Sequence, residues 1–473
     1  NGTGGTGAGG IHYGVLLGGS NVVQISGSGA VNITGNGGSG GSANYGVLLY
    51  NSGSITTSGG GAILTGNGGT GTGNNQAGIA LLQGSNISDS VGGDITLNGT
   101  AGNGSWFNVG FNMSNAPASS ITTNNGNINI TGTGGNGGNF NYGIRTMAGA
   151  QIAATGTGSV QLNGFAGNGT SDNIGITLLE ASSVSSNGGG VTFTGIGGTG
   201  TADDNKGIVL ENGSTVEDFA SGNVVLNGTG GNGTANNWGI SVLTGSVVSS
   251  LNGDLSLTGT GGNGTGNFNR GVYIDGTGTQ VSSDQGNIQI TANGGTSGSG
   301  DQHYGLLVQN SGAVQTVDGN ITVNGVGGNA GLYPLGVALV SGRIESTGTG
   351  AVSITGQGGA GTYGNWGVFT QNSNSLIAAN GGGININGTG GPGIGDFNIG
   401  VVVGFESDVI ENGTGAITII GNAASSNLAS YGILFQNLGT TIISNGGGIS
   451  VTGIGDTSIT TDAIGVVIGA EAM

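Results

Sequence analysis

A glycine followed by branched or aliphatic residues returns along the whole chain at intervals of 31 to 34 residues. A fixed period in this range is the signature of a protein built by stacking copies of one small structural unit. The period constrains the fold more than any single motif does, and it predicts a repeat architecture. The repeated glycines are Gly14, Gly46, Gly78, Gly110, Gly143, Gly175, Gly207, Gly239, Gly271, Gly305, Gly336, Gly367, Gly400, Gly432 and Gly465.

Each repeat contains three short runs of β-forming residues separated by Gly, Ser and Asn. In the third run apolar and polar residues alternate, as in Ile95-Thr96-Leu97, which is typical of a strand with one buried face. In the first run the residue after the repeated glycine is always apolar, whereas the next position accepts residues as different as Leu48 and Arg145. We expect the first of these positions to face the core and the second to face solvent.

Helix is excluded because the apolar period is two residues and because frequent glycines would cost about 1 kcal/mol each inside a helix. Three runs with one apolar face can wind as a coil whose equivalent strands pair in parallel. The chain is therefore predicted to be all-β, a right-handed parallel β-helix (β-solenoid) of about 15 coils of roughly 32 residues, with three short strands per coil and a Gly-rich loop. We expect a single continuous repeat domain over residues 1–473 and a segment of a longer repeat array.

Composition limits the partners of the chain. Its 22 acidic and 4 basic residues give a net charge of −18, so phosphate backbones and anionic membrane surfaces are repelled. No apolar stretch approaches the roughly 18 residues of a membrane span. Cysteine is absent, which excludes disulfides and thiolate metal sites. We expect no nucleic-acid binding and no membrane insertion.

Asparagine recurs two residues before the repeated glycine. Amide side chains in register can hydrogen-bond along the axis of a stack, as in other cross-β ladders. Alternatively, asparagine stands there because it tolerates a left-handed turn. The members of this possible ladder are Asn44, Asn108, Asn141, Asn173, Asn205, Asn237 and Asn269.

Aromatic residues gather just before the same glycine. They either stack on one another and cover the Gly-rich loops, or form a contact stripe for sugars or a neighbouring molecule. The possible contact stripe consists of Tyr45, Trp106, Tyr142, Trp238, Phe268, Tyr304, Trp366 and Tyr431.

The sequence contains few motifs that would indicate an enzyme active site or a cofactor-binding site. Solenoid enzymes that cut polysaccharides cluster carboxylates on one face. Here the acidic pairs, such as Asp203-Asp204 and Glu217-Asp218, are better explained as scattered charges. The Gly-rich segments lack the lysine of a phosphate-binding loop. The sequence leaves open whether isolated calcium ions bind at Asp203, Asp204 or Asp301. We expect no enzyme activity and no cofactor.

An ice-binding surface is a minor alternative. The outward side chains of the third run could form a regularly spaced array on a flat sheet. This row varies among residues such as Thr96, Asn129 and Gln161 rather than repeating threonine, which argues against that function.

The runs of the type GIxL, xVxS and xITGTGGNGT resemble the β-strand-repeat segments of large secreted bacterial surface proteins. That group includes filamentous-haemagglutinin-like adhesins and autotransporter passengers, and the resemblance covers essentially the whole chain. It implies a solenoid displayed outside the cell, in adhesion, a sheath or a matrix.

We therefore expect a non-enzymatic extracellular or cell-surface structural protein, a β-solenoid rod that assembles into a filament, sheath or surface fibre. Self-association would be head-to-tail or side-by-side, because exposed edge strands accept further strands. The alternative is a cell-surface adhesin module that binds glycans, other surface proteins or partner cells through its aromatic edge.

Overall fold

The computed structural model describes residues 1–393, 396–425, 429–436, 439–456 and 463–469. The chain divides into two compact units, and each is described by itself. Unit 1 consists of Asn1–Gly233 with Ser246–Gly253, and unit 2 of Thr234–Gly245 with the described part of Asp254–Met473. The single repeat domain expected over residues 1–473 stays a prediction.

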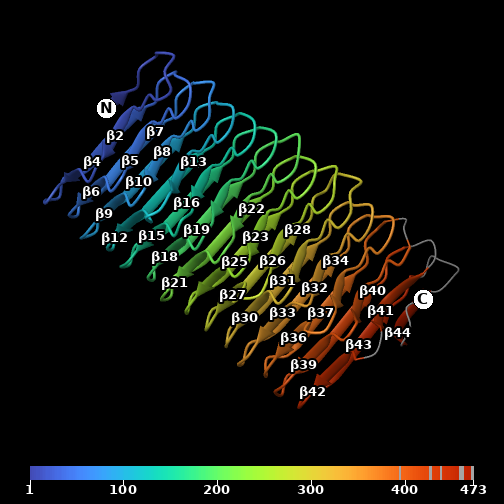
Figure 1. Ribbon diagram of the computed structural model, residues 1–473. Coiled ribbons are helices and arrows are strands. Elements are labelled where there is room, and N and C mark those ends of the chain that lie inside the picture. Colours follow the sequence, from blue (N-terminus) through green and yellow to red (C-terminus); the bar gives the residue numbers. More distant parts are fainter. Residues whose placement is uncertain (394–395, 426–428, 437–438, 457–462, 470–473) are drawn as a thin grey trace. The chain divides into compact units, whose positions relative to one another are not determined.

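In each unit every turn of the chain adds one strand to each of three parallel sheets (Figure 1). Sheet B holds the strands that follow the repeated glycines, sheet C the next strands along the chain, and sheet A the longer strands after those. Within the described residues every regular element is a strand, and the turns number about 14 with about 32 residues each. The predicted all-β parallel β-solenoid with three short strands per coil is confirmed.

In unit 1 the strands of each sheet pair in parallel in the following orders. Sheet A contains β1 (Gly2–Thr3), β4 (Val31–Asn36), β7 (Ala62–Asn67), β10 (Ile95–Thr100), β13 (Ile128–Thr133), β16 (Val160–Phe165), β19 (Val191–Ile196) and β22 (Val224–Thr229). Sheet B contains β2 (Val15–Gly18), β5 (Val47–Tyr50), β8 (Ile79–Leu82), β11 (Phe111–Ser114), β14 (Ile144–Thr146), β17 (Ile176–Leu178) and β20 (Ile208–Leu210). Sheet C contains β3 (Val22–Gln24), β6 (Ser54–Thr57), β9 (Asn86–Asp89), β12 (Ser120–Thr123), β15 (Gln151–Ala154), β18 (Ser183–Ser186), β21 (Thr215–Asp218) and β24 (Val247–Ser250).

Unit 2 repeats this arrangement. Sheet A contains β25 (Leu255–Thr260), β28 (Ile288–Asn293), β31 (Ile321–Val326), β34 (Val352–Gln357), β37 (Ile384–Thr389), β40 (Ile417–Asn422) and β43 (Ile449–Ile454). Sheet B contains β23 (Ile240–Leu243), β26 (Val272–Asp275), β29 (Leu306–Gln309), β32 (Val337–Val340), β35 (Val368–Gln371), β38 (Val401–Gly404), β41 (Ser430–Gln436) and β44 (Ala463–Gly469). Sheet C contains β27 (Gln280–Ser283), β30 (Ala313–Thr316), β33 (Arg343–Ser346), β36 (Leu376–Ala379), β39 (Asp408–Glu411) and β42 (Thr441–Ser444).

The core lies between the three sheets and stacks like residues on like residues. Ile95 of β10 pairs with Ile128 of β13, and Phe111 of β11 pairs with Ile144 of β14. All four side chains are fully buried, and burial of each stabilises the fold by up to about 1.5 to 3 kcal/mol. The alternation in the third run thus predicted the core face of sheet A correctly.

The outer face of sheet B differs from the prediction. The second residue after the repeated glycine was expected to face solvent, yet Leu48, Val209 and Phe369 at this position are buried. Side chains that precede the glycine pack against them, for example Tyr45 on Leu48 in unit 1 and Trp366 on Phe369 in unit 2. Sheet B is therefore covered on both faces, by the core and by an outer apolar layer.

The repeated glycine is required by close approach rather than by an unusual backbone angle. A Cβ atom at Gly110 would collide with the backbone of Thr133 on β13 and with the carbonyl of Gly143 in the next coil. The chain enters sheet B at this point between two other backbone segments, so any side chain would force them apart.

Candidate functional site

The polar and aromatic rows both lie in the last three residues before the repeated glycine. The first of these three has a positive φ in most coils, and in several it is aromatic, as for Phe107 (φ 64°), Phe140 (φ 64°) and Tyr333 (φ 55°). Non-glycine residues in this conformation are strained, so the packing of the rings must stabilise it. The left-handed residue stands one position before the asparagine row, so a left-handed turn does not account for the asparagines.

In unit 1 the buried amides of four successive coils, from Asn108 to Asn205, form a continuous hydrogen-bonded row. Asn108 Nδ2 donates to Asn141 Oδ1 at 2.9 Å, and Asn141 Nδ2 donates to Asn173 Oδ1 at 2.7 Å. Asn173 Nδ2 then donates to Asn205 Oδ1 at 2.6 Å. The same Nδ2 groups also bond carbonyls of their own Gly-rich loops, such as that of Gly104. We call this row the amide ladder; it ties each loop to the sheet and each coil to the next.

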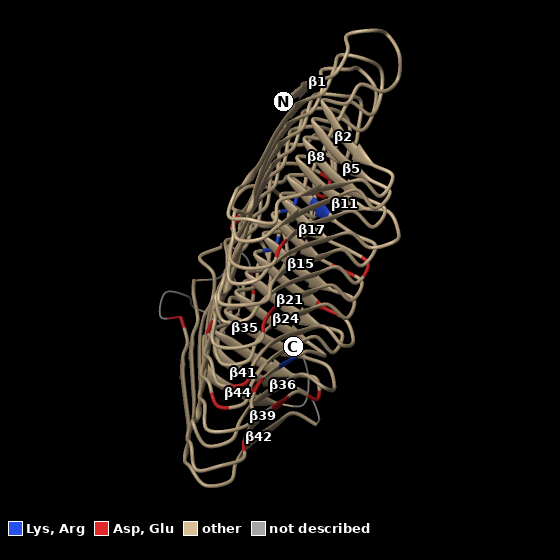
Figure 2. Cartoon of the chain, turned by 90° about the vertical axis from the view of Figure 1, so that its left-hand side faces the viewer, with Lys and Arg blue, Asp and Glu red and all other residues tan. Residues whose placement is uncertain are grey.

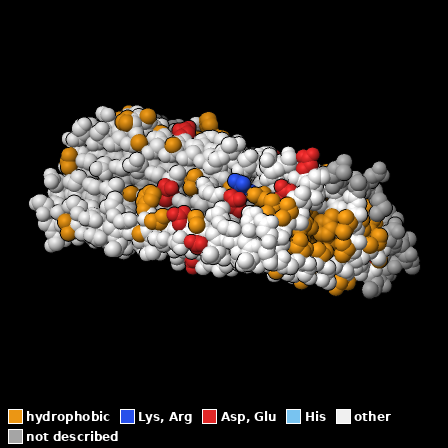
Figure 3. All heavy atoms as spheres, turned by 90° about the horizontal axis from the view of Figure 1, so that it is seen from below, with side chains coloured by type: hydrophobic (Ala, Val, Ile, Leu, Met, Phe, Trp, Pro, Cys, Tyr) orange, Lys and Arg blue, Asp and Glu red, His pale blue; other side chains and the backbone are white. Residues whose placement is uncertain are grey.

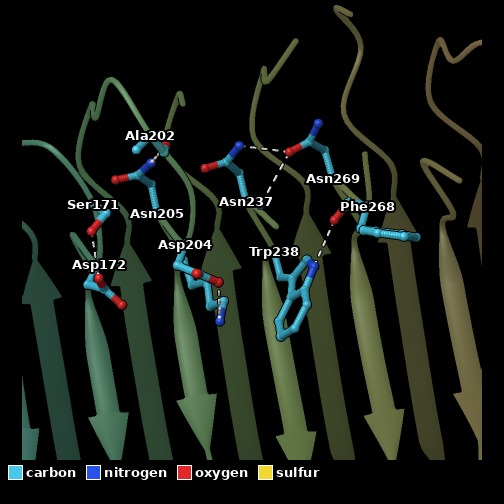
Figure 4. Close-up of polar contacts among 10 residues, drawn as sticks. Ser171, Asp172, Ala202, Asp204, Asn205, Asn237, Trp238, Phe268 and Asn269 are labelled. Atoms are coloured by element: carbon cyan, nitrogen blue, oxygen red, sulfur yellow. Dashed lines mark hydrogen bonds and ion pairs between the residues drawn. The ribbon is translucent and has the colours of Figure 1, made fainter. Parts of the chain in front are cut away.

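In unit 2 the amide ladder is present in shorter pieces. Asn237 Nδ2 donates to Asn269 Oδ1 at 2.7 Å, as Figure 4 shows, and Asn365 Nδ2 donates to Asn398 Oδ1 at 2.6 Å. Between these pairs the row holds His303, whose ring contacts Asn269 Nδ2 at 3.2 Å, and then Pro334, which has no side-chain donor.

Unpaired oxygens mark where the amide ladder begins or is interrupted. Among the described residues, Oδ1 of Asn44, Asn108 and Asn365 has no hydrogen-bond partner although it is buried. Asn108 follows Gln76, whose longer side chain donates to carbonyls of other loop residues instead. Asn365 follows Pro334. A buried acceptor without a donor costs about 1 to 3 kcal/mol, so each interruption lowers the stability of the stack.

A second polar feature lies at the end of the sheet C strands, where Asp89 in unit 1 is buried. Burial alone would raise the pKa of Asp89, but the hydrogen bonds that its carboxylate accepts outweigh burial and hold the pKa well below its ordinary value. The donors are Thr57 Oγ1 and the backbone N–H groups of Gly59, Gly61, Val91, Gly92 and Gly93, at 2.7 to 3.1 Å.

Asp218 and Glu411 occupy equivalent positions in other coils. Burial would raise the pKa of Asp218 and hydrogen bonds lower it below its ordinary value. Its carboxylate accepts from Ser186 Oγ and from the backbone N–H groups of Gly188, Gly190, Ala220 and Gly222, at 2.5 to 3.2 Å. Because the donors come from two successive coils, these carboxylates clamp the coils together. In Asp89 and Asp218 both carboxylate oxygens accept hydrogen bonds from the protein.

The other acidic side chains that the structure describes are dispersed over several coils (Figure 2). Asp204 pairs with Lys206 at 2.8 Å, as Figure 4 shows, and Glu217 accepts a hydrogen bond from Ser249 Oγ at 3.3 Å. Figure 2 shows the acidic residues spread over many turns and very few basic ones. Within the described ranges no group of three or more His, Cys, Asp or Glu residues could hold a metal ion, and no helix could cross a membrane.

In unit 1 the predicted contact stripe does not form one exposed surface. Tyr45 stacks on Tyr13 with ring centroids 5.5 Å apart. Tyr142 is buried, and its burial raises the pKa of its phenol well above the ordinary value. Its ring and that of Phe107 lie beneath the guanidinium of Arg145. Trp106 is 47% exposed and is the member of the stripe that most faces solvent in this unit.

In unit 2 two stripe members, Phe268 and Tyr304, surround a buried cation together with Tyr273. The Arg270 guanidinium carbon lies 4.9 Å from the ring centroid of Phe268, 4.6 Å from Tyr273 and 5.4 Å from Tyr304. Burial lowers the pKa of Arg270, whereas Tyr273, Tyr304 and the carboxylate of Asp275 oppose that change. Cation–π contacts of this kind hold the neighbouring rings in place.

Further along unit 2 the outer layer opens into a hollow of about 380 Å³, which we call the aromatic hollow. Figure 3 shows one broad hydrophobic patch on the surface, in the view from below. Tyr304, Trp366 and Tyr431 of the predicted stripe line the hollow, whereas Trp238 and Phe268 do not. The indole N–H of Trp366 donates to the carbonyl of Phe397 at 2.9 Å, just as that of Trp238 donates to Phe268 at 2.7 Å (Figure 4).

Sequence reasoning missed several residues that line the aromatic hollow, notably Tyr363, Phe369, Gln371 and Gln436. The two glutamines stand four residues after a repeated glycine, at the end of sheet B strands. Gly404 stands at the same position on β38, between them. When the repeats are aligned, a glycine therefore stands between two glutamines, and this pattern is visible in the sequence. We missed it because we assumed that the outer face of sheet B is exposed.

Comparison of the chain with protein-family models, with curated proteins and with solved structures finds no match. The fold itself defines the class: the chain is a parallel β-solenoid of stacked coils.

Proposed function

We propose that the chain is a non-enzymatic structural protein outside the cell, whose stacked coils build a filament, a sheath or a surface fibre. The observation that carries the proposal is the uniform register from coil to coil. Backbone pairing and core stacks connect successive coils, and the amide ladder adds side-chain bonds between several of them, so tension along the stack is shared among many hydrogen bonds. The resemblance to secreted β-strand-repeat proteins supports the extracellular location.

Self-association of the chain, head-to-tail or side-by-side, is part of this proposal. Among the described residues β43 and β44 each pair with one neighbour, and Ile449 and Ile468 are 47% and 82% exposed. Strand edges with apolar side chains accept further strands from another chain. A second copy whose coils continue the register would bury both residues.

The test is the state of the 473-residue chain at rising concentration, followed by sedimentation and electron microscopy. Wild-type protein should form fibres, and Ile449→Lys together with Ile468→Lys should abolish them, because charge at a strand edge blocks pairing. Ile63→Lys is the matched control, since Ile63 is 46% exposed on the outer face of sheet A. A wild-type chain that stays monomeric at every concentration contradicts the proposal.

The second candidate function is an adhesin module that binds glycans. The aromatic hollow favours it, because a recess lined by rings and amides is a binding surface that a purely structural coil does not need.

A further inference from the structure

The aromatic hollow lies where a sheet B strand that ends in glycine stands between two strands that end in glutamine. On sheet B, Gly404 of β38 stands opposite Gln436 of β41. The preceding strand, β35, ends with Gln371. The residue directly before the repeated glycine is Ile399 in the coil of Gly404. The same position holds Trp366 in the preceding coil and Tyr431 in the following coil. Ile399 lines the recess, as do Trp366 and Tyr431 of the coils on either side.

The walls are rigid aromatic surfaces. The ring centroid of Tyr363 lies 5.5 Å from that of Tyr333 and 5.3 Å from that of Phe397. The ring centroids of Trp366 and Phe369 lie 4.8 Å apart. Rings held by several neighbours lose little conformational freedom when a ligand packs against them. The recess is therefore organised before any ligand arrives.

Polar groups stand among these rings without partners. The side-chain amides of Gln302, Gln371 and Gln436 line the aromatic hollow, and none of them hydrogen-bonds to any described residue. Gln436 is only 8% exposed, so its amide has little access to bulk solvent. Each amide offers two N–H donors and one carbonyl acceptor.

The lining carries no charge. No Asp, Glu, Lys or Arg belongs to the described wall, and burial raises the pKa of Tyr304 to about 12, which keeps its phenol neutral at physiological pH. An ionic ligand would lose its hydration without gaining a counter-charge. A purely apolar ligand would cover the three amides and leave them unpaired, at about 1 to 3 kcal/mol each.

We propose that the aromatic hollow of unit 2 binds an uncharged saccharide. A pyranose ring has an apolar C–H face, which packs on the negative faces of Tyr363 and Trp366, and a rim of hydroxyls that both donate and accept hydrogen bonds. Those hydroxyls satisfy the amides of Gln371 and Gln436 on either side of Gly404. The cavity volume of about 380 Å³ lies in the range of small-molecule sites. This inference deepens the adhesin candidate and does not depend on fibre formation.

The experiment titrates the full chain with soluble cellohexaose and chitohexaose as neutral probes and with an oligogalacturonate as the anionic probe. Binding is followed by calorimetry and by tryptophan fluorescence. The double variant Gln371→Leu with Gln436→Leu removes both amides at nearly constant volume. Gln289→Leu is the control, since Gln289 is exposed on the outer face of sheet A in the same unit. Circular dichroism establishes that the variants fold.

At least one neutral oligosaccharide should bind, and the oligogalacturonate should bind at least tenfold more weakly. The double variant should weaken saccharide binding at least tenfold, while Gln289→Leu leaves it within twofold. Absence of binding by both neutral probes overturns the inference, as does equal affinity in the double variant. An apolar dye that enters the hollow and that no saccharide displaces also overturns it, in favour of an apolar ligand. Fibres are scored separately by microscopy, so loss of one proposal does not remove the other.

Discussion

The longest unbroken part of the amide ladder in unit 1 spans four coils, whereas in unit 2 the ladder consists of separate pairs. In unit 1 four successive coils carry asparagine and connect it through three side-chain bonds, from Asn108 to Asn205. In unit 2 the row contains a histidine and a proline between its two asparagine pairs. The aromatic hollow belongs to the unit with the interrupted ladder.

Strand pairing continues through the interruption. Leu306 pairs with Val337, and Val337 with Val368, across the coils that carry His303 and Pro334. The ladder therefore does not set the register, which follows from the core and the backbone. The ladder adds stability to the loops. Where it is absent, the residues before the repeated glycine can have other roles, such as lining the aromatic hollow.

The largest expected effect comes from breaking the continuous ladder at its middle. Asn141→Leu leaves Asn108 Nδ2 and Asn173 Oδ1 without their partners, so we expect a loss of about 3 to 5 kcal/mol in local stability. Asn365→Leu, at the start of a two-membered piece, removes fewer bonds and should cost about half as much. Hydrogen exchange of the loop amides in each unit measures both changes.

The control for this pair is Asn98→Leu, because Asn98 is exposed on the outer face of sheet A and should tolerate the change. Equal losses at positions 141 and 365 would mean that the number of ladder bonds does not determine the stability of a coil.

The second prediction concerns the carboxylate clamp of unit 1. Asp218→Asn cannot accept all the backbone donors around it and should cost about 2 to 4 kcal/mol at neutral pH. The pKa of Asp218 is lowered by folding, so this stability is fully present above the unfolded pKa of about 3.9 and is lost as pH falls through the folded value. Denaturant midpoints of wild type and variant should therefore converge below pH 4.

Convergence of the two denaturant midpoints at low pH is expected only if the charged carboxylate of Asp218 stabilises the fold. A difference between wild type and Asp218→Asn that stays constant from pH 7 to pH 3 would show that the carboxylate charge contributes nothing, and that only the shape of the side chain matters.

Two buried threonines in the apolar stack of sheet B, one in each unit, allow a further comparison. Thr146 in unit 1 and Thr370 in unit 2 interrupt the apolar stack of sheet B, and among the described residues neither hydroxyl has a partner. Thr→Val keeps the shape and removes the unpaired group, so each variant should gain about 1 kcal/mol. Thermal unfolding and hydrogen exchange of the neighbouring strands measure the gain. A loss at either site would mean that its hydroxyl finds a partner in solution.

The sequence predicted the repeat, the strands and the core because these depend on a period of two residues and on the spacing of one glycine. It could not predict that Leu48 and Phe369 are buried, since their cover comes from Gly-rich loops whose path no alternation specifies. Gln371 and Gln436 line the aromatic hollow from coils on either side of Gly404, and these three residues follow one another at intervals of about one coil in the sequence. Their relation becomes readable only after the register is known.

The smallest expected effect is the repair of the interrupted ladder. Pro334→Asn supplies an amide donor one coil before Asn365, whose Oδ1 is buried and unpaired among the described residues. A new bond should contribute about 1 kcal/mol, and loss of the rigid proline offsets about 0.4 to 1 kcal/mol of it. Pro334→Ala separates the two contributions, because it removes the proline without adding the amide. The asparagine variant should therefore be more stable than the alanine variant by about 1 kcal/mol or more in denaturant titrations. Equal stability of the two would mean that the coil around Pro334 holds its loop where an amide cannot reach Asn365, and that the interruption is fixed by the backbone rather than by one side chain.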